Sequence, residues 1–175
     1  GMWVSRGKWQ PGGEPRLVTV TSQAGNVGSP ALSPDGSQVA FSWNGEKGAT
    51  RDIYVQMMGQ TDALRLTTDP AADNWPEWSP DGKRFAFTST RHGNQELYVA
   101  DVAGGDWQRL TTDTAIDAHP SWSSDGNTIA FTTNRWGDLE IALINPDGSN
   151  LRRLTQSKGL DDYPAWSPDG TRIAF

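Results

Sequence analysis

The residues that could do chemistry in this chain are aromatic side chains, two histidines and several carboxylates at regular intervals. A large ring stands directly before a proline three times, as Trp75, His119 and Tyr163, and Ser29 occupies the corresponding first place. Rigid aromatic side chains offer contact area at low entropic cost, so they are typical of binding surfaces. Further candidates for the same surface are Trp43, His92 and Trp136, with Asn74 and Asp162 as polar neighbours.

A second set of candidates consists of carboxylates that recur three residues before the repeated proline. Asp73, Asp117 and Asp161 occupy this place. Their repetition favours a structural role, in which each side chain bonds the backbone of its own loop. The alternative is a ring of oxygen ligands that holds a hard cation at the mouth of a channel. Because Val27 stands at the first of these places, we expect no metal and no cofactor.

Motifs for catalysis are absent from the sequence. The chain has no cysteine and only two histidines, and it contains no Gly-x-Ser-x-Gly, His-Glu-x-x-His or phosphate-loop motif. Its net charge of −6 argues against nucleic-acid binding. No apolar run approaches the roughly 20 residues that a membrane-spanning helix needs, so direct membrane insertion is not expected. These observations exclude the common enzyme classes and favour a binding protein.

An internal repeat must position these candidate residues. The tetrad Ser-Pro-Asp-Gly begins at Ser33, Ser79 and Ser167, and Ser-Ser-Asp-Gly begins at Ser123. A proline stands three residues before each tetrad, and an apolar triplet that ends in Ala-Phe follows each one. The tryptophan directly before the last three tetrads recurs at one strand position, so we expect it to pack between repeats. These tryptophans are Trp78, Trp122 and Trp166.

Turn chemistry within one repeat predicts four short antiparallel strands. In the tetrad, proline presets φ, aspartate suits the next place, and glycine accepts the positive φ that closes a hairpin. In the second repeat the expected strands lie near 78–79, 85–88, 96–100 and 108–111. Four such strands in about 44 residues form one blade of an all-β propeller. The pairs Arg91/Glu96 and Arg135/Glu140 are expected to be cross-strand ion pairs.

The repeated sequence resembles the TolB-type, WD-repeat-like β-propeller family. The shared pattern is Pro-x-Trp-Ser-Pro-Asp-Gly, then Ile-Ala-Phe-Thr-x-x-Arg, Gly-x-x-Glu-Ile and Arg-Arg-Leu-Thr, and it matches best over 76–111 and 120–155. Family repeats serve many proteins, among them a periplasmic protein that binds envelope partners, peptidase propeller domains and sensor regions of bacterial regulators. The resemblance implies a bacterial propeller in a periplasmic or otherwise extracytoplasmic location.

We expect residues 1–175 to form one propeller domain or propeller fragment of about four blade equivalents. The repeat units lie near 30–75, 76–119 and 120–163, with half-blades at 1–29 and 164–175. The two half-blades complement each other, which leaves three arrangements open. We favour an eight-bladed ring shared by two identical chains; the others are a closed four-bladed ring and an open piece of a longer propeller.

The sequence therefore predicts a non-catalytic binding module that recognises a protein or peptide. In this hypothesis the aromatic candidates lie on loops of one face, the top face, around the entrance of the channel. An alternative is carbohydrate binding or a role in polysaccharide processing, since tryptophan and tyrosine also stack on sugar rings. A third possibility is a truncated or engineered propeller fragment that has no ligand of its own.

Overall fold

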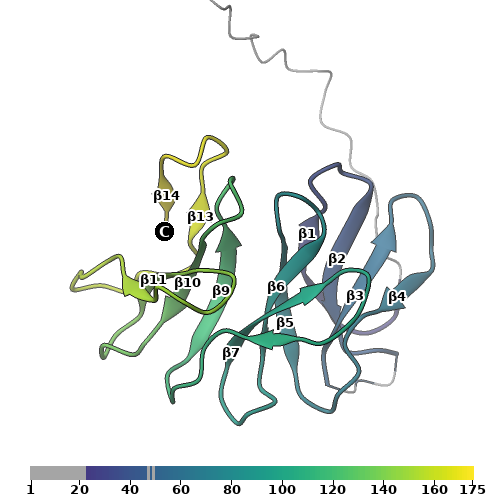
Figure 1. Cartoon of the computed structure of the whole chain (residues 1–175). Helices are drawn as coiled ribbons and strands as arrows, with labels where there is room; N and C mark the ends of the chain where they lie inside the picture. The colour runs from purple at the N-terminus through teal and green to yellow at the C-terminus, as the bar shows by residue number, and fades with distance from the viewer. Residues whose placement is uncertain (1–22, 47, 49) are drawn as a thin grey trace, which may run out of the picture.

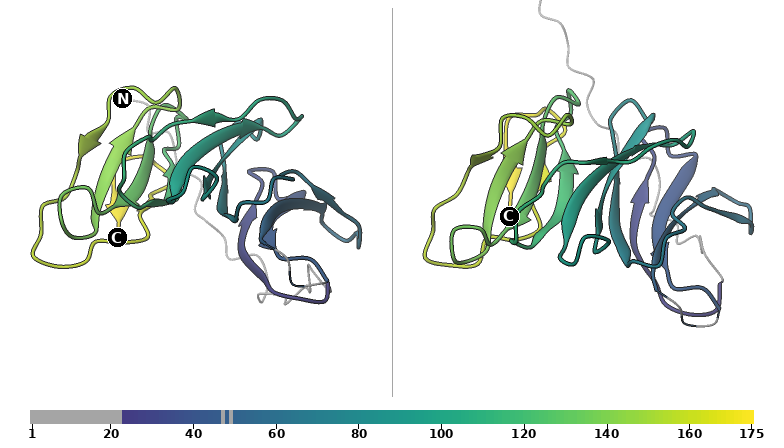
Figure 2. Two further views of the ribbon diagram at one scale, coloured as in Figure 1. Left: turned by 90° about the horizontal axis from the view of Figure 1, so that it is seen from below. Right: turned by 60° about the horizontal axis from the view of Figure 1, so that its bottom comes forward.

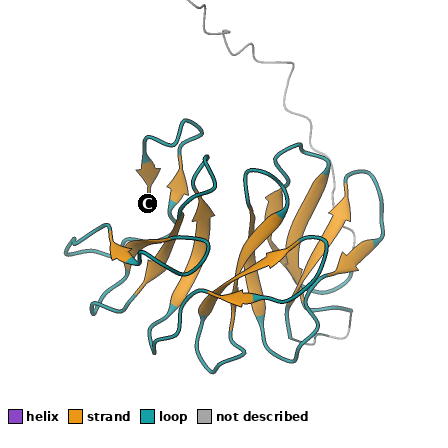
Figure 3. Cartoon of the chain, viewed as in Figure 1, coloured by secondary structure: helices purple, strands orange, loops and turns teal. Residues whose placement is uncertain are grey.

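The structure, a computed structural model, describes residues 23–46, 48 and 50–175. All regular structure in these residues is β-strand (Figure 3). No helix of the described residues is long and apolar enough to cross a membrane. Most of the half-blade predicted at 1–29 lies outside the described residues, so its pairing stays a prediction.

The strands form three four-stranded antiparallel sheets and one two-stranded sheet (Figure 1). Within each sheet the order follows the chain, so each strand pairs with its neighbours in sequence. The first blade contains β1 (Val27–Leu32), β2 (Gln38–Trp43), β3 (Asp52–Met57) and β4 (Ala63–Arg65). The second contains β5 (Asp73–Trp78), β6 (Arg84–Ser89), β7 (Glu96–Asp101) and β8 (Gln108–Arg109). The third contains β9 (Asp117–Trp122), β10 (Ile129–Thr133), β11 (Glu140–Ile144) and β12 (Arg152–Arg153), and the last pair is β13 (Ala165–Trp166) and β14 (Ile173–Ala174).

These sheets confirm the all-β fold and the four strands predicted for one repeat. They also show that each four-stranded sheet begins before the proline that was taken as a unit boundary. Pro76, for example, lies inside β5, and Pro120 lies inside β9. The first strand of each blade is therefore longer than turn chemistry alone indicates.

Each tetrad closes the hairpin between the first two strands of its blade. In the second blade the Ser79 hydroxyl donates to Asp81 Oδ1 at 2.6 Å, and the Gly82 amide donates to the Ser79 carbonyl at 2.9 Å. The hydroxyl of Ser79 and the amide of Lys83 hold the pKa of Asp81 below its usual value. Gly82 has a φ of 68°, in the left-handed region that glycine adopts without strain. The tetrad carboxylates are thus part of the turns, as expected from their repetition.

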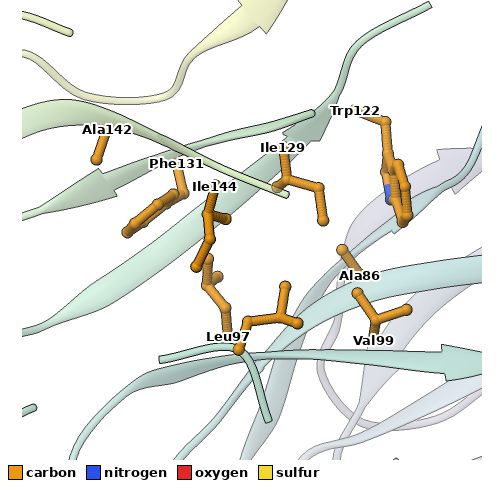
Figure 4. Packing of buried hydrophobic residues seen from close by; sticks show 9 residues of the cluster. Ala86, Leu97, Val99, Trp122, Ile129, Phe131, Ala142 and Ile144 are labelled. Atoms are coloured by element: carbon orange, nitrogen blue, oxygen red, sulfur yellow. The ribbon is translucent and has the colours of Figure 1, made fainter. Parts of the chain in front are cut away.

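Buried apolar side chains join successive blades. Between the second and third blades, Leu97 and Val99 of β7 face Ile129 and Phe131 of β10 (Figure 4). Trp122 packs in the same cluster, and its indole nitrogen donates to the backbone carbonyl of the second blade's inner strand at 3.2 Å. Trp78 makes the equivalent bond to the first blade at 3.0 Å. These contacts confirm that Trp78 and Trp122 are inter-blade core.

The ion pairs differ from those predicted. Glu96 pairs with Arg109 of β8 at 2.8 Å, and Glu140 pairs with Arg153 of β12 at 2.5 Å. Both carboxylates are fully buried and also accept a hydrogen bond from a threonine hydroxyl. The expected pairs Arg91/Glu96 and Arg135/Glu140 were wrong because strand four brings a nearer arginine to each glutamate. The two displaced arginines bind aspartates that precede the first strand or begin it.

The first strands of the blades lie next to one another along the inside of an arc. Contacts link β1 to β5, β5 to β9, and β9 to β13. Figure 2 shows the blades following one another around this arc, with the later strands of each blade farther out. The inner strands are where a propeller channel is lined, so side chains on them are the first candidates for a binding site.

Candidate functional site on the inner strands

A β-bulge interrupts the first strand of each of the three described four-stranded blades. In β5 the register shifts between Asn74 and Glu77, and β1 shifts at the equivalent place. The residue before the proline has a positive φ, 52° at Trp75, 52° at His119 and 54° at Tyr163. Such values are uncommon for non-glycine residues, and a bulge re-aims the side chain that it displaces. Repetition of this conformation shows that the repeat itself positions these side chains.

The bulge corrects the predicted location of these residues. Trp75 and His119 lie within β5 and β9, not on the loops between blades, and Tyr163 lies just before β13. Proline is tolerated inside a strand that lies at the edge of its sheet or that contains a bulge. Both conditions hold for β5 and β9. Pro76 and Pro120 therefore lie inside strands, whereas Pro164 directly precedes β13.

Three of the predicted rings form one group, called the inner aromatic cluster: Trp75, His119 and Tyr163. The rings of His119 and Tyr163 are stacked, with centroids 3.7 Å apart and planes 16° from parallel. The Trp75 ring meets His119 edge to face at 4.4 Å. Each ring comes from a different blade, so the cluster spans three inner strands. Tyr163 is 63% exposed, which leaves an aromatic face open to a partner.

A hydrogen-bond network fixes His119 within the inner aromatic cluster. Its Nδ1 lies 2.7 Å from Asp162 Oδ1. Thr132 and the Tyr163 amide also donate to that oxygen, each at 2.8 Å. Although burial alone would raise the pKa of Asp162, the bonds from Thr132 and His119 hold it below its usual value. An ionised carboxylate only accepts, so Nδ1 carries the proton of this bond.

A pocket of about 190 Å³ opens beside the inner aromatic cluster. Its lining consists of the four X-Pro pairs of the inner strands and one carboxylate, Glu77. Glu77 is half-buried, and burial raises the pKa of its carboxyl from 4.5 to about 7. In the part of the chain that the structure describes, this carboxylate has no hydrogen bond or ion pair. The pocket thus combines aromatic faces with one unpaired acid.

Sequence reasoning missed Glu77, although a signal for it exists. The place after the repeated proline holds Ala31, Glu77, Ser121 and Ala165 in the four repeats. A charged residue at only one of four equivalent places departs from the structural pattern. Comparison of the repeats place by place would have singled it out.

The other predicted aromatic residues pack on their own blades and do not line this pocket. Trp43 ends β2, where its indole nitrogen donates to the Ala24 carbonyl at 2.8 Å. His92 lies on the loop after β6, and its Nδ1 lies 2.5 Å from the hydroxyl of Tyr98. Trp136 lies under the guanidinium groups of Arg135 and Arg153, 5.6 and 5.1 Å from its ring centroid. The predicted surface is therefore divided, with three rings inside the arc and three elsewhere.

Of the two predicted polar neighbours, Asp162 contacts the inner aromatic cluster and Asn74 does not. Asp162 joins the inner aromatic cluster through His119. Asn74 does not line the pocket; its Oδ1 accepts from Arg51 at 3.3 Å, across the junction of the first two blades.

The repeated aspartates bind side chains, not the loop backbone that was predicted. Asp117 accepts two hydrogen bonds from Arg135, at 2.9 and 2.8 Å, and Asp161 accepts one from Ser157. Asp73 lies 3.8 Å from Arg91, and burial raises its pKa to about 6. Among the described residues, no three histidine or acidic side chains gather as metal ligands would. The neighbouring arginines support a structural role for these carboxylates.

The blade repeat of this chain also occurs in known proteins. A family model described as the TolB beta propeller domain matches residues 14–175. The chain belongs to this family. The resemblance seen in the repeats is thereby confirmed.

The chain matches only part of the length of two similar TolB proteins. The Tol-Pal system protein TolB of Alcanivorax borkumensis is 30% identical over 78 residues, which are 45% of this chain and 18% of that protein. The crystal structure of TolB from Acinetobacter baumannii is 31% identical with a TM-score of 0.71, over 83% of this chain and 36% of that one. The chain therefore matches only 18% and 36% of the length of these two relatives.

Enzymes also contain this fold. The crystal structure of puromycin hydrolase has a TM-score of 0.69 at 22% identity, over 85% of this chain and 24% of the hydrolase. At this identity the likeness shows the propeller fold and nothing about activity.

Proposed function

We propose that this TolB-family propeller chain is a non-catalytic binding module whose inner aromatic cluster recognises a protein or peptide segment. The observation that carries the proposal is the contact of three rings beside a pocket: His119 stacks on Tyr163 and meets Trp75 edge to face. Exposed aromatic faces next to a concavity are typical anchors of peptide recognition. The name of the Alcanivorax relative places it in a multi-component system, which agrees with a protein partner.

The pocket favours a peptide over an extended sugar chain. Its volume of about 190 Å³ lies below the roughly 300–1,000 Å³ of pockets that hold drug-sized ligands. A single side chain of a partner fits this space better than an oligosaccharide. Carbohydrate binding remains an outcome of the test and is checked on a glycan array.

The proposed setting is the bacterial periplasm or another extracytoplasmic space. TolB proteins are periplasmic, which supports the location expected from the sequence. Catalysis is not part of the proposal, because among the described residues no hydrogen bond joins His119 to Ser29, the serine of the pocket lining.

Selection from a random dodecapeptide phage library on the immobilised chain, followed by calorimetry, tests the proposal. We expect Tyr163→Ala to weaken the best selected peptide at least tenfold, because it removes an exposed ring from the inner aromatic cluster. The same truncation at Trp136 is the matched control, since that ring packs on arginines outside the pocket. Equal losses in both variants, no loss in Tyr163→Ala, or glycan binding without any selected peptide would contradict the proposal.

A further inference from the structure

The pocket beside the inner aromatic cluster contains the carboxylate of Glu77, which makes no ion pair with the described residues. Buried glutamates elsewhere in the described chain are neutralised, Glu96 by Arg109 and Glu140 by Arg153. Glu77 is half-buried and has no such partner among the described residues. Leaving a carboxylate partly desolvated and unpaired costs free energy, which a binding partner can recover by supplying the opposite charge.

The surroundings of Glu77 suit a long cationic side chain. Trp75, two places before it on β5, His119 on β9 and Tyr163 before β13 share its pocket. A guanidinium or ammonium group interacts favourably with aromatic faces as well as with a carboxylate. The described residues that line the pocket include no arginine or lysine that could take this place from within the chain.

We propose that Glu77 determines specificity in this pocket, which takes an arginine or lysine side chain of the partner peptide between the carboxylate and the inner aromatic cluster. The proposal rests on the proposed function and adds the chemical class of the residue that is recognised. The pocket volume of about 190 Å³ matches one inserted side chain. The raised pKa of Glu77 agrees with a carboxylate that gains from a cationic partner.

The test uses the peptides selected on the whole wild-type chain. We expect a basic residue to recur in them, and its replacement by glutamine to weaken binding to the wild type at least fivefold at pH 8. Glu77→Gln should weaken the unmodified peptide to a similar degree. The two changes together should cost little more than either alone, because each removes the same interaction.

Glu46→Gln is the matched control, because it removes the same charge from an exposed loop between β2 and β3. It should leave the affinity unchanged within twofold, which separates a specific contact from a general effect of the net charge of −6.

The outcomes separate this inference from the function on which it rests. Peptides that depend on Tyr163 but lose less than fivefold on either charge removal would overturn the role of Glu77 and leave the binding site intact. Additive losses in the double change would also overturn it, since the two charges would then act independently. If no peptide is selected, or if binding ignores Tyr163, the proposed function fails and the inference fails with it.

Discussion

Many charged residues of this propeller recur at equivalent places in successive blades, where they stabilise the fold. Each blade places a buried acid at the start of strand three and an arginine in strand four, as in Asp52–Arg65 and Glu96–Arg109. Glu77 follows no such pattern, and its carboxylate lacks a cation among the described residues. We therefore expect the wild-type chain to be less stable than one that is neutral at this place.

The first prediction concerns the pH dependence of that difference. Because the folded-state pKa of Glu77 is raised from 4.5 to about 7, the native chain binds this proton more tightly than the unfolded chain. The free energy of unfolding of the wild type should then fall as pH rises from about 4.5 to 7. Glu77→Gln removes this penalty, so its melting temperature should match the wild type at pH 4 and exceed it at pH 8.

Thermal unfolding followed by circular dichroism at both pH values measures the difference in melting temperature between the two chains. The titration of Asp73 is common to both chains and cancels in this difference. Glu46→Gln should behave as the wild type does at both pH values. A difference between Glu77→Gln and the wild type that does not change with pH would show that the carboxyl is not destabilised by burial.

Residue types and spacing predicted the turns but not the ion pairs. The tetrad acts through near neighbours in sequence, such as Ser79 and Asp81, so local chemistry is sufficient. The partner of Glu96 is set by how strand four lies beside strand three, which spacing does not reveal. The same limit hid the missing partner of Glu77: comparison of the repeats singles out the residue, but its lack of a partner depends on the surroundings of the inner strand.

At the scale of elements, the tetrad turns also connect neighbouring blades. A Cβ added to Gly126 would lie 3.3 Å from Pro80 Cγ, and one added to Gly170 would lie 2.6 Å from Ser124 Oγ. The second tetrad residue of one blade thus lies against the tetrad glycine of the next. Only the third tetrad has serine in place of proline at this position.

A second prediction follows for that turn. Ser124→Pro should raise the free energy of unfolding by about 0.4–1 kcal/mol, because proline restricts the unfolded chain and suits the φ of this turn position. Prolines at the three equivalent places show that the turn accepts the ring. Urea unfolding measures the change, with Ser124→Ala as the control. A lower stability of Ser124→Pro would mean that the third turn differs from the others.

The elements themselves were predictable, and the bulge was not. Four strands per repeat follow from turn residues and β-formers, and β6 and β7 lie where they were expected. The first strand was expected near 78–79, after the proline. A proline inside a strand conflicts with local chemistry, because it lacks the amide that a strand interior needs. The bulge at Trp75 and Pro76 removes that conflict, and it moves the site from the loops to the inner strands.

At the scale of the whole molecule, the arc presents apolar residues at both ends. Leu32 occupies the place of Trp78 and Trp122, yet it is 60% exposed, whereas those tryptophans are covered by the preceding blade. Phe175 is 61% exposed at the opposite end. These two residues are therefore candidates for a contact between two copies of the chain.

The shared ring therefore stays a prediction with its own measurement. Light scattering on a sizing column should give about twice the 19.1 kDa of the chain if two copies complete one ring. Leu32→Lys should then shift the mass towards 19.1 kDa, because it places a charge in the shared contact. A wild-type mass of 19.1 kDa at all concentrations would contradict self-association.

Tryptophan indole signals distinguish a binding surface on the inner strands from one on the outer loops. In a ¹⁵N-labelled chain, Trp→Phe substitutions assign the indole N–H groups of Trp75, Trp43 and Trp136. When a selected peptide is added, we predict that the signal of Trp75 shifts while those of Trp43 and Trp136 stay in place. Shifts at Trp43 or Trp136 with none at Trp75 would contradict a site on the inner strands and return it to the loops.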